Sequence, residues 1–271
     1  MNTLITQSHK QIINAMIRFL KTQTKKRGFS RVVYGLSGGL DSAIVGRLSQ
    51  MAFGKNATAL LMPTSLSSKE NLQDARDFTN HFDIPHHIIS LSDYEPILQK
   101  YPKMSKERFG NLCARLRMMI LYDYSAQEHA LVVGTSNKTE RILGYGTIYG
   151  DLAYAINPIG NFYKTELFEL AHHLEIPHSI IHKKPSADLF EGQTDEEDLG
   201  FSYQEIDHLL QKIEERKLNL YKTDVIFDMI RGEFSQSLLS SVLTRISKNS
   251  FKNKGPSIFT SRTHKSKESA Q

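Results

Sequence analysis

Four short apolar runs alternate with helical patterns in the first half of the chain, and this alternation limits the possible folds more than any other feature. The runs lie at 32–36, 57–62, 87–91 and 130–134. Between them, apolar residues recur at helical spacing, in the longest case over 108–126. Strands that are apolar throughout are buried on both faces, as in a parallel sheet covered by helices on each side. The sequence therefore predicts an α/β protein with a doubly wound, mostly parallel sheet and helices on both faces.

Further helical patterns surround these runs. We expect helices over 12–28, 43–54 and 67–81. The last of these is expected to begin with Ser67 as its N-cap, because Glu70 follows three residues later in a capping-box pattern. The helices over 43–54 and 67–81 would each connect two parallel strands by a crossover, whereas the helix over 12–28 precedes the first strand.

The regularity weakens after the fourth run. A helix is expected over 163–174, and two or three helices over 202–248 form a helical C-terminal part. The segment 183–200 is charged and lacks periodicity, so we expect a mobile lid. Because no internal repeat or change in composition marks a boundary, we predict one domain over 1–255, followed by a basic, flexible tail over 256–271.

The bulk composition argues against several classes of protein. No apolar run approaches the roughly 18 residues that span a bilayer, and the first residues lack the features of a signal peptide. The single cysteine, Cys113, cannot form an internal disulfide and is expected to pack within a helix, which favours a reducing, cytoplasmic location. The 11 histidines show no spacing typical of a metal site. We therefore expect a cytoplasmic protein with no membrane segment.

The net charge of +5 raises the question of nucleic-acid binding. Much of the positive charge lies near the C-terminus, at Lys248, Lys252, Lys254, Arg262, Lys265 and Lys267. That segment is polar and carries few apolar residues, so a solvated tail is favoured over a phosphate-binding arm. We expect no nucleic-acid partner.

The stretch GLSGGLDS, residues 35–42, follows the first apolar run and precedes a helix. Ligands of open parallel sheets bind beyond the carboxyl ends of the strands, where this stretch lies. Gly38 and Gly39 allow backbone N–H groups to converge on an anion at a helix N-terminus, and the hydroxyls of Ser37 and Ser42 can donate to phosphate oxygens. A plain strand-to-helix turn would need one glycine and neither serine nor aspartate. The stretch therefore predicts a phosphate-binding loop.

Asp41 is the most informative residue of this loop. A carboxylate beside a polyanion is unfavourable unless a cation lies between them, so Asp41 indicates Mg²⁺. The loop lacks the Gly-Lys-Ser/Thr of a Walker A motif and the G-x-G-x-x-G of a dinucleotide site. Thr135 and Glu140 follow the fourth run, so they should emerge at the same edge of the sheet. Taken alone, Glu140 could equally be a solvated glutamate in the first turn of a helix.

SGGLDS after a first strand resembles the pyrophosphate loop of the N-type ATP pyrophosphatases, which cleave ATP between its α and β phosphates. Four further segments narrow this resemblance to the ammonia-dependent NAD synthetases. They are GTSNKTE at 134–140, GNLCARLRM at 110–118, YGDLAYAINPIGNFYKTEL at 149–167 and KPSADLFEGQTDEEDLGFSYQEID at 184–207. The resemblance covers residues 10 to 255, which implies a single NAD synthetase domain with an adenine nucleotide alpha hydrolase-like fold.

The resemblance implies a ligase of NAD biosynthesis. Deamido-NAD would be amidated with ammonia at the expense of ATP, through an adenylated intermediate, to give NAD, AMP and pyrophosphate. It also implies Mg²⁺ and a homodimer with deamido-NAD bound near the interface. Two other readings stay open: another N-type ATP pyrophosphatase, such as a tRNA-modifying adenylase, and a non-catalytic nucleotide sensor. The first predicts an RNA-binding extension, and the second predicts loss of the metal-binding pair Asp41 and Glu140.

The resemblance also assigns roles to single residues. Asp41 and Glu140 would hold the metal, and Asp41 and Lys164 would act electrostatically in catalysis. The ATP-binding residues would be Gly35, Leu36, Ser37, Gly38, Gly39, Leu40, Asp41, Ser42, Thr135, Lys164 and Ser186. The residues that bind deamido-NAD would be Asn111, Arg115 and Lys252.

Asn111 and Arg115 share a helix face with Arg108, and simple solvation is the alternative reading of that polar face. The chain departs from the family pattern at Ile148, Ala155 and Phe251, where some relatives carry lysine, aspartate and histidine. These departures concern the contacts with deamido-NAD and not the ATP chemistry.

Overall fold

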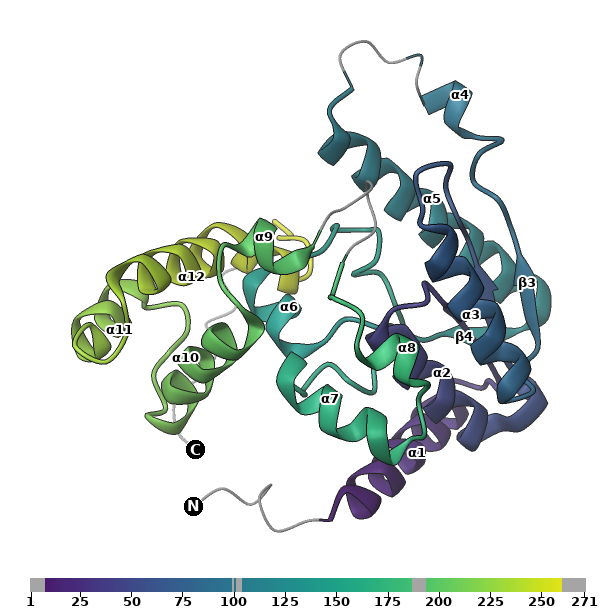
Figure 1. Ribbon diagram of the computed structural model, residues 1–271, viewed down its shortest axis with the longest axis horizontal. Coiled ribbons are helices and arrows are strands. Elements are labelled where there is room, and N and C mark those ends of the chain that lie inside the picture. The colour runs from purple at the N-terminus through teal and green to yellow at the C-terminus, as the bar shows by residue number, and fades with distance from the viewer. Residues whose placement is uncertain (1–7, 99, 101–103, 187–193, 260–271) are drawn as a thin grey trace.

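A four-stranded parallel sheet lies at the centre of the computed structural model, which describes residues 8–98, 100, 104–186 and 194–259. The strands run in the order β3-β2-β1-β4. Their bounds are β1 Arg31–Gly35, β2 Ala57–Leu61, β3 His86–Ile88 and β4 Ala130–Val132. All three pairings are parallel, with Val33 opposite Thr58 of β2 and Val132 of β4. The predicted doubly wound α/β fold is confirmed (Figure 1).

Each face of the sheet has its own hydrophobic core, because successive side chains of a strand point to opposite faces. Val32 and Tyr34 of β1 belong to the larger core, and Val33 between them belongs to the other. The larger core is covered by α1 (His9–Lys26), α2 (Leu40–Phe53), α3 (Lys69–His81) and α7 (Lys164–His173). The opposite core is covered by α5 (Lys106–Glu128), where Cys113 is buried as expected. The alternation of apolar and helical segments thus produced the predicted layers.

The C-terminal part forms a third core from three amphipathic helices. These are α10 (Tyr203–Glu215), α11 (Thr223–Ile230) and α12 (Gln236–Asn249). The glycine-rich loop GYGTIYGD lies at 144–151. Leu143 before it and Tyr163 after it join this core and connect it to the sheet layer. The prediction of a single domain over 1–255 stays a prediction.

Shorter helices complete the structure at α4 Glu95–Leu98, α6 Lys138–Leu143, α8 His178–Ile181 and α9 Asp195–Leu199, with 3₁₀ turns at Gly54–Asn56 and Ser250–Asn253. Over the described residues, no helix is long and apolar enough to cross a membrane. The basic tail is described only as far as Phe259, whose side chain is exposed.

The structure corrects three local predictions. The N-cap of α3 is Ser68 and not Ser67, because the Ser67 hydroxyl instead accepts from the backbone N–H of Thr64 at 3.1 Å. β4 ends at Val132, and Val133 makes a single parallel bridge to Ile156. The segment 183–200 is not structureless, since α9 occupies its end; residues 187–193, to which the lid prediction also applies, lie outside the described residues.

Candidate active site

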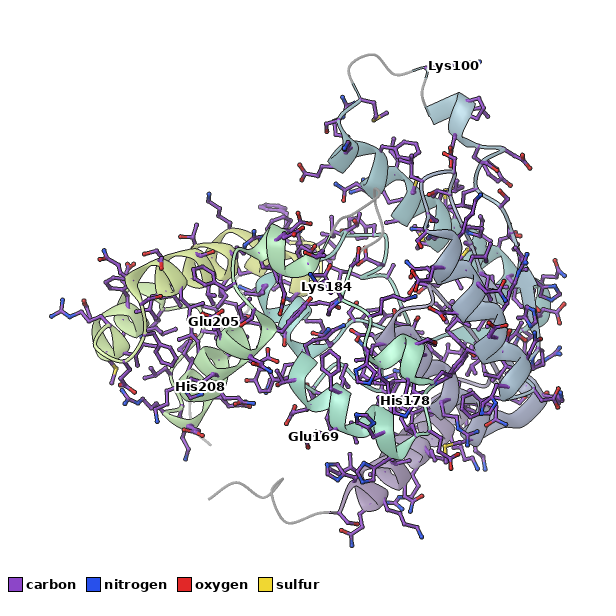
Figure 2. The ribbon with its side chains drawn as sticks, viewed as in Figure 1. Lys100, Glu169, His178, Lys184, Glu205 and His208 are labelled. Carbon is purple, nitrogen blue, oxygen red and sulfur yellow. The ribbon has the colours of Figure 1, made fainter. Side chains whose placement is uncertain are left out.

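A large cavity opens beyond the carboxyl ends of β1 and β4. These two strands are neighbours, and the chain leaves β1 toward β2 on one side of the sheet and returns at β4 on the other. Such a switch point is where open α/β sheets bind ligands. The cavity has a volume of about 820 Å³, large enough for a nucleotide, and Lys184 lies at it between the C-terminal helices and the sheet layer (Figure 2).

Most residues assigned from the resemblance lie around this cavity. Those that line it are Gly35, Leu36, Ser37, Gly39, Leu40, Asp41, Ser42, Asn111, Thr135, Glu140, Lys164, Ser186 and Lys252. Gly38 and Arg115 are not among the lining residues. The roles of all these residues in binding stay predictions, but their gathering around one cavity is what those roles require.

Gly38 shapes the loop between β1 and α2. Its φ of +83° lies in the left-handed region, which favours glycine. A Cβ atom there would lie 2.1 Å from the backbone oxygen of Asn71 at the start of α3, so no side chain fits without moving that helix. The loop therefore passes close to the start of α3 before it enters α2.

Two serine hydroxyls hold the same loop in shape. The Ser42 hydroxyl donates to the carbonyl oxygen of Gly39 at 2.9 Å, and the Ser37 hydroxyl accepts from the backbone N–H of Gly39 at 3.2 Å. The two hydroxyl oxygens lie 3.0 Å apart. Gly39 is the N-cap of α2 and offers no capping side chain, so this helix start presents its backbone N–H groups to the cavity.

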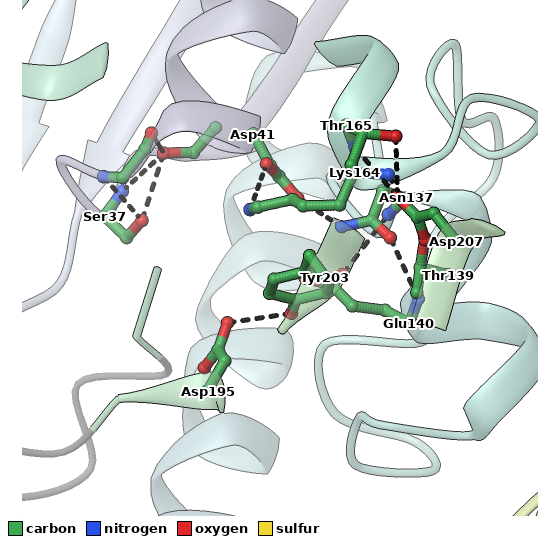
Figure 3. A network of polar contacts seen from close by, with 12 residues as sticks. Ser37, Asp41, Asn137, Thr139, Glu140, Lys164, Thr165, Asp195, Tyr203 and Asp207 are labelled. Carbon is green, nitrogen blue, oxygen red and sulfur yellow. Dashed lines mark hydrogen bonds and ion pairs between the residues drawn. The ribbon is translucent and has the colours of Figure 1, made fainter. Parts of the chain in front are cut away.

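Asp41 is buried and held from two sides at the bottom of the site (Figure 3). The ammonium group of Lys164 lies 2.6 Å from its Oδ1, and the side-chain amide of Asn137 donates to its Oδ2 at 2.7 Å. Lys164 is the first residue of α7 and is only 4% exposed. A cation at a helix N-terminus opposes the helix dipole, so its position is explained by the carboxylates around it.

Glu140 is the second carboxylate of this site. Asn137 and Glu140 form the capping box of α6, in which the Asn137 Oδ1 accepts from the N–H of Glu140 at 2.9 Å. Burial, reinforced by the charge of Asp41, raises the pKa of Glu140 well above its usual value. Burial alone lowers the pKa of Lys164, but the charges of Asp41 and Glu140 raise it overall. The Lys164 ammonium group thus contacts Asp41 and is also under the charge of Glu140, and two carboxylates around one cation favour a further cation.

Three further residues near Asp41 and Glu140 were not predicted from the sequence. Asn137 joins Asp41 to the start of α6, as described above. Asp195, at the start of α9, is 4% exposed and accepts from the hydroxyls of Tyr203 at 3.0 Å and Tyr145 at 3.3 Å. Asp207 of α10 bonds to α6 and α7 at the side of the site away from the cavity. Asn137 lies within the quoted segment at 134–140, and Asp195 and Asp207 lie within the one at 184–207, but spacing alone gave none of the three a role.

The residues assigned to deamido-NAD are partly engaged within the protein. The Asn111 Oδ1 accepts from the Thr147 hydroxyl at 2.6 Å, and the Lys252 ammonium donates to the carbonyl oxygens of Gly144 and Gly146 at 2.8 and 3.0 Å. Both contacts hold the glycine-rich loop that follows α6. Arg115 is half-buried on α5 and lies outside the cavity lining, which instead includes Arg117.

The three departures from the family pattern also lie outside the cavity lining. Ala155 packs against the larger core, and Phe251 is 56% exposed. Among the residues that the structure describes, no group of three or more His, Cys, Asp or Glu side chains could hold a metal ion. Mg²⁺ does not require such a group, because it takes one or two carboxylates together with phosphate oxygens and water.

Comparison with known proteins identifies the family. The NAD synthase family model matches residues 12–256. The chain is 51% identical over 253 residues to the NH(3)-dependent NAD(+) synthetase of Helicobacter acinonychis, with 92% of this chain and 96% of the relative covered. It is 49% identical over 248 residues to the protein of the same name from Wolinella succinogenes, with 91% and 94% covered.

Two solved structures share the fold. The NH3-dependent NAD synthetase of Campylobacter jejuni superposes with a TM-score of 0.79 at 36% identity, and the NMN synthetase of Francisella tularensis with 0.80 at 32%. In each case 94% of this chain and 100% of the other are covered. The family model and the curated relatives extend over the 35–42 loop, the buried Asp41–Lys164 pair and the C-terminal helices alike, and this chain belongs to the NAD synthase family.

Proposed function

We propose that this protein is an ammonia-dependent NAD synthetase, which amidates deamido-NAD with ammonia and converts ATP to AMP and pyrophosphate. The observation that carries this assignment is the 51% identity to an NH(3)-dependent NAD(+) synthetase over nearly the whole chain. The phosphate-binding loop and the Asp41–Lys164 pair at the switch point of the sheet supply the groups that such a reaction needs.

The reaction begins when the carboxylate of the nicotinic acid group attacks the α-phosphorus of ATP. Pyrophosphate leaves toward the 35–42 loop, where the N–H groups at the start of α2 and the Ser37 hydroxyl can donate to its oxygens, while the Ser42 hydroxyl holds the loop through Gly39. Lys164 neutralises the charge that develops on the leaving phosphates. Ammonia then attacks the mixed anhydride, and NAD and AMP are released. The protein contributes mainly alignment and electrostatic stabilisation.

Asp41 and Glu140 are suited to hold Mg²⁺. Their carboxylates are close enough for the charge of Asp41 to raise the pKa of Glu140, and a divalent cation between them would remove this repulsion. When bound, Mg²⁺ would neutralise phosphate charge beside the loop. Lys164, which lies against Asp41, would supply a second positive charge beside the phosphates.

The assignment is tested by incubating the purified protein with ATP, Mg²⁺, ammonium and deamido-NAD. We expect NAD and AMP to appear in equal amounts, and removal of the metal with EDTA should stop the reaction until Mg²⁺ is restored. Absence of both products would contradict the assignment. That result would favour the alternative of a non-catalytic nucleotide sensor. Formation of AMP only with added tRNA would instead support a tRNA-modifying adenylase.

A second candidate comes from the structural similarity to an NMN synthetase, which covers 94% of this chain. The same assay with nicotinic acid mononucleotide in place of deamido-NAD distinguishes the two activities by their kcat/KM values. Because the curated relatives with about half of their residues identical are named NAD(+) synthetases, we expect deamido-NAD to be the better substrate.

We also propose that the protein is a homodimer in the reducing cytoplasm. Large apolar side chains of β3, α4 and α5 are exposed, namely Ile88 at 41%, Ile97 at 60%, Met119 at 61% and Tyr122 at 40%. A second copy of the chain would cover them, and the single cysteine suits a reducing compartment.

Sedimentation equilibrium should give about twice the chain mass of 30.9 kDa. Met119→Glu should shift the protein toward the monomer, because it places a charge in the apolar contact. Met51→Glu, on the exposed side of α2, is the matched control and should leave the mass unchanged. A monomer for the unaltered protein at micromolar concentration would contradict the proposal.

A further inference from the structure

Asp207 is a buried carboxylate that the proposed reaction does not use. It lies on α10, is 1% exposed, and is not among the residues that line the cavity. It accepts three hydrogen bonds: one from the Thr139 hydroxyl at 2.5 Å, and two from Thr165, through its backbone N–H and its hydroxyl, both at 2.9 Å (Figure 3). One side chain of the C-terminal part is thus bonded to two other helices.

The partners of Asp207 are sequence neighbours of the two charged residues of the site. Thr139 directly precedes Glu140 in α6, and Thr165 directly follows Lys164 in α7. The Thr139 hydroxyl also accepts from the backbone N–H of Lys164 at 3.1 Å. Asp207 therefore links the first turns of both helices, and these turns carry the carboxylate and the ammonium group that face the cavity.

Burying the carboxylate of Asp207 costs free energy, and this cost indicates that the place of the carboxylate between α6 and α7 is important. The three donors to Asp207 are all neutral, and burying a carboxylate among neutral groups costs more than packing an apolar side chain of similar size. The N-terminus of α7 offsets part of that cost, since Thr165 is at its second position. The feature that an apolar residue could not reproduce is the simultaneous attachment of α6 and α7.

We propose that Asp207 is a positioning residue that fixes the distance between Glu140 and Lys164 around the phosphates of ATP. This inference rests on the proposed NAD synthetase activity. Asp207 acts through Thr139 and Thr165 and does not touch the substrates. Its effect is expected on the step in which ATP is cleaved, because misplacing a catalytic group by about 1 Å can cost roughly a hundredfold in rate.

Asp207→Asn is the first test, because asparagine keeps the size of the side chain but replaces one acceptor oxygen with a donor. We expect kcat to fall by about 10- to 100-fold, with a higher Mg²⁺ concentration for half-maximal activity and a KM for deamido-NAD within about threefold of the unaltered protein. A residue with only a structural role would lower the melting temperature without moving kcat and the Mg²⁺ dependence together.

Glu205→Gln is the matched control on the same helix. Glu205 also accepts from one backbone N–H and one hydroxyl, both of Ser202, at 2.9 and 2.7 Å, but it is exposed, in the first turn of α10 (Figure 2). The substitution removes one negative charge from the same helix, in a side chain whose hydrogen bonds to Ser202 do not reach α6 or α7. Its kcat and Mg²⁺ dependence should stay within about threefold of the unaltered protein.

A pair of variants at Thr139 tests the linkage even if Asp207→Asn does not fold. Thr139→Val removes the hydroxyl and should lower kcat as Asp207→Asn does, whereas Thr139→Ser keeps the hydroxyl and should restore it. A folded Asp207→Asn with kcat within threefold of the unaltered protein would overturn the inference. So would equal losses in Thr139→Ser and Thr139→Val, or an equal loss in Glu205→Gln. An inactive unaltered protein would instead contradict the proposed function itself.

Discussion

Asp41→Asn is expected to lower kcat by about a thousandfold while the protein stays folded. The substitution removes the charge that faces both Lys164 and the proposed metal position, but it keeps the shape of the side chain. The amide oxygen can still accept from Lys164 or Asn137, and the charge of Glu140 still acts on the ammonium group, so that group is not left without a carboxylate. Initial rates of AMP release, together with circular dichroism and melting temperature, measure the two effects separately.

The control for loss of one negative charge is Asp77→Asn. Asp77 lies on the exposed side of α3, where it accepts from Gln73 at 2.9 Å, and it does not line the cavity. Its activity should match that of the unaltered protein. If Asp41→Asn also kept activity within a few-fold, the role of Asp41 at the metal position would be ruled out.

Lys164→Met is expected to be the second most damaging change, with kcat lower by about a hundredfold or more. Methionine fills the space of the lysine stem but removes the ammonium group. Asp41 and Glu140 are then left together without a cation, and breaking a buried ion pair in this way costs about 3 to 5 kcal/mol of stability. Chemical denaturation would measure the loss of stability, and single-turnover formation of AMP would measure the loss in the ATP-cleaving step.

Lys164→Arg tests whether charge alone is enough. Lys164 is 4% exposed, and its ammonium group approaches Asp41 as a compact point charge at 2.6 Å. A planar guanidinium is larger and donates in a fixed fork, so it should not restore the rate although it keeps the charge. Recovery of full activity in Lys164→Arg would show that the site does not depend on the position of the ammonium group.

The sheet could be predicted, and the loop after its first strand singled out, because both signals are local. Continuous apolar runs indicate buried parallel strands, and Gly38, Gly39 and Asp41 lie within six residues of the strand they follow. The N-cap of α3 was missed because the capping-box pattern of Ser67 and Glu70 favours Ser67, whereas in the structure the Ser68 hydroxyl accepts from the N–H of Asn71. Only the contact of Ser67 with Thr64, made after the loop has folded, distinguishes them.

The rest of the site depends on contacts between distant segments. Asp207 bonds to a residue 68 positions away, and Lys164 to one 123 positions away, so no local spacing predicts either pair. Helical periodicity correctly placed Asn111 on a polar face of α5. Periodicity alone does not predict which residues of that helix line the cavity. The structure turns Arg117 toward the cavity and leaves Arg115 outside its lining, because the packing of α5 on the sheet sets the rotation of the helix.

Asn137 gives the hydrogen bonds around Asp41 a fixed direction. Its Oδ1 accepts from the backbone at the start of α6, so its amino group has to point the other way and donate to Asp41. Turning the amide over would place two acceptors against each other at Asp41 and two donors against each other at Glu140. The polarity of one buried amide thus fixes which of its ends meets Asp41, and the start of α6 orients that carboxyl group before any substrate arrives.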